Sequence, residues 1–202
     1  MRNRFGFLWL LLALLLPAMV GAQPLPGSSP EKFIIGGSSG IFRIAYDDFP
    51  GLYDGRAGFI YGGQALLKVF APYFAVAKLN VFKKDGTIDS TGAAVNWRQR
   101  GISIGVRYVG YRERKLVSYL GFGFVFFNIK EDGAASLFGG QAGSRNATGL
   151  FLNGGLEYRF APRASVFLDV EVSSAGLKGK SGFQGNSVGG FSIGLGVNAF
   201  IF

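Results

Sequence analysis

The chain has 202 residues, a formal net charge of +9, 33 glycines and 21 phenylalanines, and it contains no cysteine and no histidine. The lack of cysteine excludes a disulfide framework and a lipid anchor on an N-terminal cysteine. The lack of histidine removes the commonest general base and metal ligand near neutral pH, so the composition argues against an enzyme.

Residues 1–22 have the three parts of a secretory signal. Arg2 and Arg4 precede an apolar run over residues 5–16, and small residues precede a cleavage site after Ala22. The run is short for a membrane-spanning helix of about 20 residues. The sequence therefore favours a cleaved signal peptide helix over an uncleaved anchor. Loss of the two arginines leaves 19 − 12 = +7 for the exported chain.

The remaining chain predicts a short lead-in and one domain. Residues 23–31 (QPLPGSSPE) are rich in Pro and Ser and are expected to be extended, whereas residues 32–202 contain eight strand-like runs and no convincing amphipathic helix. Each run is longer than the about 5–6 residues of a usual strand and at least as long as the about 9–11 residues of a tilted membrane strand. The runs cover residues 33–46, 57–70, 73–84, 96–109, 115–129, 148–160, 164–175 and 188–202.

The connections between these runs alternate in length. Four are long, polar and rich in glycine, at residues 47–56, 85–95, 130–147 and 176–187. Three are short, at residues 71–72, 110–114 and 161–163. Short turns at one end, long loops at the other and an even number of strands are typical of outer-membrane barrels. The pattern predicts an all-β, eight-stranded antiparallel up-and-down transmembrane β-barrel, with both chain ends on the short-turn, periplasmic side.

The clearest strand period lies between residues 148 and 172. Even positions are almost all apolar, whereas odd positions carry most of the polar and charged side chains. The two apolar sets share one face only if the paired residue numbers sum to an even value, so we expect a three-residue turn at 161–163. The apolar set comprises Leu150, Leu152, Leu156, Tyr158, Phe160, Val166, Leu168, Val170 and Val172.

The two faces of the predicted barrel differ in charge. The middle of the apolar face carries no charged residue, and the other face combines charges with small residues. A charge at the lipid-facing midplane costs about 2–4 kcal/mol. We therefore expect the apolar face to contact lipid and the charges to line a narrow lumen, which eight strands leave just wide enough for side chains. The predicted lumen polar network comprises Lys68, Lys78, Arg107, Glu157, Arg159, Asp169 and Glu171.

Aromatic residues gather near the ends of the runs and predict girdles at the two membrane interfaces. A general preference of aromatic residues for strands is the alternative explanation. Near the short turns are Phe70, Tyr73, Tyr108, Tyr111, Tyr158, Phe160, Phe200 and Phe202. At the other end are Tyr46, Phe59, Tyr61, Phe82 and Trp97.

Segments 154–160 (GGLEYRF) and 194–202 (GLGVNAFIF) resemble small outer-membrane barrels of Gram-negative bacteria. The pattern of the whole mature chain is similar to the OmpA, OmpX and OmpW types. In its pattern of residues the chain most resembles the outer membrane protein β-barrel domain group common in Bacteroidetes. The resemblance implies a C-terminal signal that the barrel-assembly machinery reads. Its residues here are Gly194, Gly196, Phe200 and Phe202.

The C-terminal segment departs from the usual form of that signal. The terminal aromatic residue normally continues the lipid-facing register, but here the apolar face runs through odd positions to Ile201. Phe200 and Phe202 therefore fall on the other face. A bulge near Asn198 would restore them to the lipid-facing side.

Together these features predict an integral outer-membrane protein with a structural or surface-interaction role, no enzymatic activity and no cofactor. The alternatives are a narrow channel or carrier for small or hydrophobic solutes, and a secreted soluble β-barrel that binds a ligand. A catalytic cluster around Glu157 and Asp169 is a weaker alternative, because a charge network that satisfies itself explains these residues.

The expected partners follow from the predicted location. They are outer-membrane lipid and lipopolysaccharide, and the barrel-assembly machinery during biogenesis. We expect a monomer. No long run of Lys and Arg supports binding to nucleic acid, so the basic charge is expected to face lipid headgroups, another anionic surface or solvent.

Overall fold

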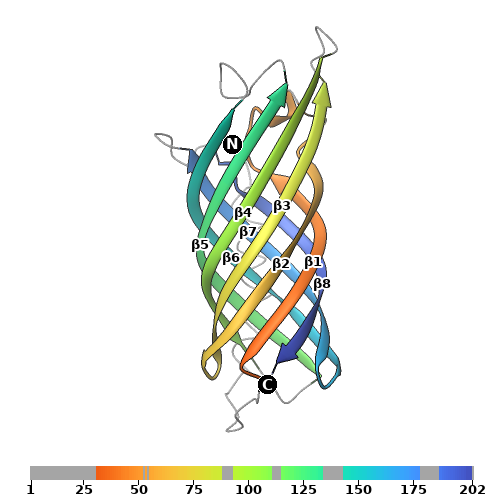
Figure 1. Cartoon of the computed structure of the whole chain (residues 1–202), viewed down its shortest axis with the longest axis vertical. Coiled ribbons are helices and arrows are strands. Elements are labelled where there is room, and N and C mark those ends of the chain that lie inside the picture. Colours follow the sequence, from red (N-terminus) through yellow and green to blue (C-terminus); the bar gives the residue numbers. More distant parts are fainter. Residues whose placement is uncertain are drawn as a thin grey trace, which may run out of the picture.

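The computed structural model describes residues 31–51, 53, 55–87, 93–110, 115–133, 143–177 and 187–201. They form an all-β closed barrel in which each strand pairs antiparallel with its neighbours in chain order and β1 closes on β8 (Figure 1). This confirms the predicted fold class. The strands are β1 (Phe33–Ile44), β2 (Ala57–Phe70), β3 (Tyr73–Thr87), β4 (Ala94–Val109), β5 (Leu116–Gly133), β6 (Ser144–Ala161), β7 (Ala164–Leu177) and β8 (Gly190–Ile201), with a short 3-10 helix η1 (Phe49–Gly51) after β1.

The predicted signal peptide at residues 1–22 and nearly all of the lead-in lie outside the described residues. The described chain starts at Glu31, and Lys32 donates a backbone hydrogen bond to the carbonyl of Ile201 at 3.1 Å. The start of β1 and the end of β8 therefore lie together at the short-turn end. No helix in the described part of the chain is long and apolar enough to cross a membrane.

Strands β3 to β7 extend further towards the long-loop end than the predicted runs, whereas β1 ends two residues earlier and β8 begins two residues later than predicted. β5 continues to Gly133, and its pairing with β6 runs in unbroken register up to Lys130 and Ser144. In the extensions of β3, β5 and β6 the outward side chains are polar, so the apolar alternation that marks a membrane strand is lost there. The backbone ladder nevertheless continues, because hydrogen bonds between strands do not depend on a lipid-facing side chain.

The turn between β6 and β7 differs from the predicted three-residue loop. Ala161 pairs with Ala164, so the turn contains only Pro162 and Arg163. The register then shifts by one residue between Arg159 and Ala161, as in a β-bulge. The bulge supplies the extra residue that the parity argument required. The apolar sets of β6 and β7 therefore share one face, as predicted.

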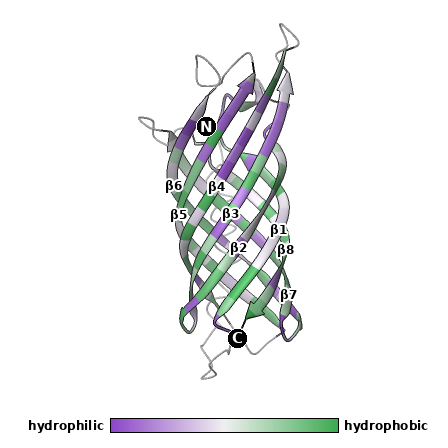
Figure 2. Cartoon of the chain, in the orientation of Figure 1, coloured by the Kyte–Doolittle hydropathy of each residue, from purple (hydrophilic) through white to green (hydrophobic). Residues whose placement is uncertain are grey.

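Large apolar side chains cover the outer wall of the barrel. Along the strands, outward hydrophobic positions alternate with inward residues. Hydrophobic residues are concentrated below the long-loop end (Figure 2). A soluble barrel requires the opposite orientation, with the charged face outside. Exposed outward residues include Phe122, Phe124, Leu150, Leu156, Ile193 and Leu195.

The inward face is more apolar than the sequence pattern predicted. Phe74, Phe151 and Phe167 are buried in the lumen together with the charged groups. Eight strands enclose a narrow space, and close packing there requires large side chains as well as small ones. The lumen is thus a packed core rather than a row of charges separated by glycines.

Two inward glycines allow β4 and β5 to approach closely. Gly105 pairs with Gly123. A Cβ atom at Gly123 would overlap the carbonyl oxygen of Ile104, and one at Gly105 would overlap the carbonyl oxygen of Phe122. Only glycine fits these positions without a backbone shift.

Candidate functional site

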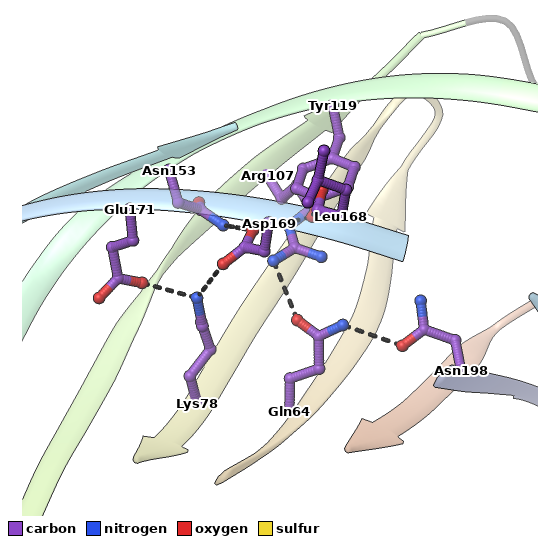
Figure 3. A network of polar contacts seen from close by, with 9 residues as sticks. All are labelled: Gln64, Lys78, Arg107, Tyr119, Asn153, Leu168, Asp169, Glu171 and Asn198. Atoms are coloured by element: carbon purple, nitrogen blue, oxygen red, sulfur yellow. Dashed lines mark hydrogen bonds and ion pairs between the residues drawn. The ribbon is translucent and has the colours of Figure 1, made fainter. Parts of the chain in front are cut away.

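A buried ionic cluster crosses the middle of the lumen (Figure 3). The ammonium of Lys78 on β3 lies 2.8 Å from Asp169 Oδ2 and 2.6 Å from Glu171 Oε2, both on β7. The two carboxylates share a face because side chains two residues apart in a strand point the same way. Asp169 Oδ1 accepts hydrogen bonds from the Tyr119 hydroxyl at 2.8 Å and from the Asn153 amide at 2.7 Å. We call these five residues the Lys78 cluster.

A chain of polar contacts continues from this cluster to other strands. The Arg107 guanidinium lies over the Tyr119 ring, 4.3 Å from its centroid, and donates a hydrogen bond to Gln64 at 3.0 Å. Gln64 donates to Asn198 at 2.9 Å (Figure 3), and Asn198 donates to Glu157 at 3.1 Å. The contacts link β2, β4, β6 and β8 across the interior.

Arg159 extends this chain to the short-turn end. Its guanidinium lies 2.6 Å from Glu31 and 3.7 Å from Glu157, and 4.6 Å from the centroid of the Phe200 ring. Glu31 is buried although it precedes β1. The ion pairs and the aromatic ring therefore fill the lumen where the described chain begins and ends.

The structure brings six of the seven predicted lumen residues into these linked contacts. The seventh, Lys68, is half-buried on the inward face of β2 near the short turn. The predicted network did not include Gln64, Tyr119, Asn153 and Asn198, which join the charged groups to one another, although the alternation placed Gln64, Asn153 and Asn198 on the polar face. The available signal was register, because each of these polar residues occupies an inward position of its strand.

Two small cavities lie beside the Lys78 cluster. One of about 20 Å³ is lined by Ser38, Lys78 and Asp169, and another of about 10 Å³ by Phe82, Gln99 and Glu171, among others. A water molecule requires roughly 10–15 Å³. Each of these two cavities therefore has room for on the order of one water, and neither can hold a larger solute.

The first long connection turns inward and covers the long-loop end of the lumen. Phe49 in η1 is 0% exposed, and its ring stacks on Tyr53 at a centroid distance of 4.5 Å. Phe49 also packs edge-on against Trp97 at 5.2 Å, and the Tyr53 hydroxyl donates a hydrogen bond to Glu131 at 3.4 Å. The mouth cluster is defined as Phe42, Phe49, Tyr53, Phe82 and Trp97.

Burial raises the pKa of Tyr53, and the negative charge of Glu131 raises that pKa further. The hydroxyl therefore stays protonated near neutral pH and can keep donating its hydrogen bond. The hydrogen bond from Tyr53 to Glu131 therefore links the first long connection to β5.

The predicted aromatic girdle at the long-loop end is wrong for three of its five residues. Tyr46, Phe82 and Trp97 are buried, whereas Phe59 and Tyr61 are exposed on the outer wall. The prediction used position along the strand and ignored parity, which turns Phe82 and Trp97 inward. At the other end four of the eight predicted residues are exposed on the outer wall, namely Phe70, Tyr73, Tyr158 and Phe160. Tyr108 is half-buried and Phe200 is buried, and Tyr111 and Phe202 lie outside the described residues.

The C-terminal strand keeps one register throughout. β8 pairs with β1 and with β7 without a shift, so no bulge at Asn198 turns Phe200 outward. Phe200 is 3% exposed and lies inside the barrel beneath Arg159. Phe202 lies outside the described residues, and Gly194 and Gly196 occupy half-buried inward positions.

The arrangement of the network indicates a structural role. Glu157 and Asp169 are each held by hydrogen bonds from neighbouring side chains. Among the described residues, no group of three or more acidic residues is placed to hold a metal ion. The charges neutralise one another in a narrow space and rigidify the interior.

Comparison with known proteins gives a family and several similar structures. Residues 10–199 match the model of a family described as outer membrane protein beta-barrel domain. No curated protein matches the chain. Neisserial surface protein A (NspA) is 13% identical, with a TM-score of 0.61, over 84% of this chain and 96% of that one.

Two further solved structures share the fold. The outer membrane protein OprG from Pseudomonas aeruginosa is 16% identical, with a TM-score of 0.62, over 87% of this chain and 98% of that one. The attachment invasion locus protein Ail of Yersinia pestis, in complex with the heparin analogue sucrose octasulfate, is 15% identical, with a TM-score of 0.54. That match covers 85% of this chain and 98% of Ail. At these identities the likeness concerns the fold alone.

Proposed function

The chain belongs to the outer membrane protein β-barrel domain family, and we propose that it acts in the bacterial outer membrane as a plugged, non-enzymatic barrel with a structural or surface-contact role. The observation that carries this proposal is the filled lumen. The Lys78 cluster fills the middle of the lumen. The contacts of Arg159 with Glu31, Glu157 and Phe200 fill its short-turn end, and the mouth cluster fills its long-loop end. A channel or carrier for solutes needs a path through all three.

The proposed surface-contact role places its contacts at the long-loop end. Outer-membrane barrels have short periplasmic turns and longer extracellular loops, and the four long connections of this chain join strand ends that lie at one end of the barrel. Ail, which shares this fold, was crystallised with a heparin analogue, and NspA is described as a surface protein. These examples support contact with an external molecule as one use of such a barrel.

The proposed partners are those of a protein embedded in this membrane. Lipopolysaccharide and phospholipid would cover the apolar band, and the barrel-assembly machinery would insert the chain after export. A single copy is sufficient, because closure of β1 on β8 leaves no free strand edge among the described strands. Removal of the signal peptide at residue 22 remains part of this proposal.

Conductance in planar lipid bilayers tests the plugged lumen. The folded protein is expected to give no steady conductance steps. A variant with Phe49→Ala and Tyr53→Ala should also stay silent, because the Lys78 cluster still fills the middle of the barrel. Adding Lys78→Ala, Arg107→Ala and Arg159→Ala to that variant removes side chains at all three levels of the lumen and should raise the conductance. Steady steps from the unmodified protein would contradict the proposal and favour a channel.

The non-enzymatic part has a separate test. Glu157→Gln is expected to leave every envelope-associated hydrolytic activity of an expressing strain unchanged. An activity that depends on the protein and disappears in this variant, with the barrel still folded, would contradict that part of the proposal.

A further inference from the structure

The outer wall carries a group of cations at the long-loop end of β3, β4 and β5. Lys83, Arg98, Arg100 and Lys130 all occupy outward positions and are exposed. Figure 2 shows hydrophilic residues at these strand ends, beyond the hydrophobic band. We call these four residues the basic strip.

The strand register places three of these cations directly side by side. Lys83 pairs with Arg98, and Arg98 pairs with Lys130. Cβ atoms of directly opposite residues lie about 4.5–5.5 Å apart, and like charges at that spacing are destabilising. Within the described part of the chain, none of the four cations forms an ion pair with a carboxylate. A surface that is unfavourable in isolation suits contact with an external anion.

The height of the basic strip follows from the apolar band on β5. From Leu116 to Phe126 the outward positions are apolar apart from Ser118. Ten residues at about 3.4 Å each, tilted by about 40°, span about 26 Å, which matches the about 25 Å expected of the lipid-facing band. Lys130 lies four residues further, about 10 Å beyond the edge by the same geometry.

On β4 the strip begins closer to the hydrocarbon. Arg100 lies two residues beyond Ile102, or about 5 Å above the apolar band. The headgroup layer is about 5–8 Å thick on each side of the bilayer. Arg100 therefore lies within that layer, and the long side chains of Arg98 and Lys130 can reach into it from just above.

A hollow in the outer wall joins the strip to the apolar band. Its volume is about 550 Å³. The Asn128 amide donates to Asn146 at 2.9 Å and to Ser144 at 3.1 Å, so polar groups continue the rim onto β6. The hollow has a polar side and an apolar side, as a lipid with a charged headgroup requires. Its lining includes Arg100, Asn128 and Asn146 above and Leu79, Ile102 and Phe126 below.

The nearest acidic residues lie farther from the membrane. Asp85 and Asp132 occupy the next outward positions beyond Lys83 and Lys130, in one row with Asn96. Cations thus lie closest to the hydrocarbon and carboxylates outside them. An anion held just above acyl chains meets the cations first.

We propose that the basic strip binds the phosphate groups of lipid A, the phosphorylated glycolipid base of lipopolysaccharide, in the outer leaflet. This assignment rests on the proposed location in the outer membrane. The phosphates of lipid A are attached to its sugar backbone directly above several acyl chains, which is the level of the strip and the hollow. Several cations in one row suit a headgroup that carries more than one anionic group.

Titration of the folded protein in detergent micelles with lipid A tests this assignment. The variant Lys83→Gln, Arg98→Gln, Lys130→Gln should bind lipid A about 100-fold more weakly, because each cation near an anionic lipid surface contributes about fivefold. The control Lys32→Gln, Lys115→Gln, Arg163→Gln removes the same charge from exposed positions at the short-turn end. That control should bind lipid A like the unmodified protein.

Dephosphorylated lipid A gives a second comparison that needs no variant. It should bind the unmodified protein about 100-fold more weakly than lipid A, because the contacts between the cations and the phosphates are lost. Two results would overturn the assignment. One is undiminished binding of lipid A by the variant Lys83→Gln, Arg98→Gln, Lys130→Gln, and the other is binding of phosphatidylglycerol by the unmodified protein as tight as its binding of lipid A. Failure of the proposed function has a different signature. The protein would then not reach the outer membrane as a folded barrel, whatever lipid it bound in micelles.

Discussion

Lys78→Met should cause a large loss of stability. The Lys78 side chain is 7% exposed and contacts two carboxylates, at 2.8 and 2.6 Å. The substitution removes two hydrogen bonds between charged groups, worth about 1.5–3 kcal/mol each. It also leaves Asp169 and Glu171 together without their cation, and removal of one partner of a buried ion pair costs about 3–5 kcal/mol. We expect the free energy of unfolding to fall by about 4 kcal/mol.

Urea unfolding in lipid vesicles, followed by tryptophan fluorescence, measures this loss. In a chain without residues 1–22, Trp97 is the only tryptophan, and it is 1% exposed. Lys83→Met makes the same change on the outer wall of the same strand and should cost within about 0.5 kcal/mol. Combining Lys78→Met with Glu171→Gln should recover most of the loss, since Asp169 then keeps the buried Arg107 guanidinium as its countercharge.

Two results would refute this reasoning. A loss below about 1 kcal/mol for Lys78→Met would mean that water solvates the carboxylates and that the cluster does not close the lumen. Failure of the double variant Lys78→Met, Glu171→Gln to regain stability would mean that packing of the lysine stem, and not its charge, supports the barrel.

Three further predictions concern the packed interior. Gly123→Ala should destabilise the barrel by about 1–3 kcal/mol through overpacking, while Gly37→Ala, whose Cβ would meet its nearest atom at 3.7 Å, should be tolerated; urea midpoints compare the two. Phe49→Ala should open the mouth cluster and make the fluorescence of Trp97 more sensitive to iodide, and unchanged quenching would count against the plug. Because the pKa of Tyr53 is raised, the mouth cluster should be fully stable below the ordinary tyrosine pKa of about 10 and weaken as the pH rises above it. Tyr53→Phe should remove that part of the pH dependence, and its persistence would assign the effect to another group.

Much of the wall could be predicted from the sequence because it depends on a single period. Alternation of apolar and polar residues gives the two faces, and the lengths of the connections give the topology. Strand β2 begins and ends where the pattern predicted. The ends of β3, β5 and β6 were underestimated because strands that leave the membrane keep their hydrogen-bond ladder but lose the apolar alternation.

The interior was harder to predict because its contacts join residues far apart in the chain. Charge alone indicated Lys78 and Asp169, but their 2.8 Å contact depends on the curvature that brings β3 opposite β7. The plug formed by Phe49 was not predicted, since an aromatic residue in a polar loop has no period to follow. The odd or even position of Phe82 and Trp97 in their strands predicts that both side chains point inward. The girdle prediction considered only their position along the strand and therefore missed this.

The central claim is that the chain folds as a closed barrel in the outer membrane with its apolar face towards lipid. Expression of the full-length chain in a Gram-negative host, isolation of the outer membrane and comparison of unheated with boiled samples on SDS gels test this most directly. A band in that fraction whose mobility changes on boiling is the predicted result. A soluble periplasmic protein with no such change would contradict the assignment of the two faces.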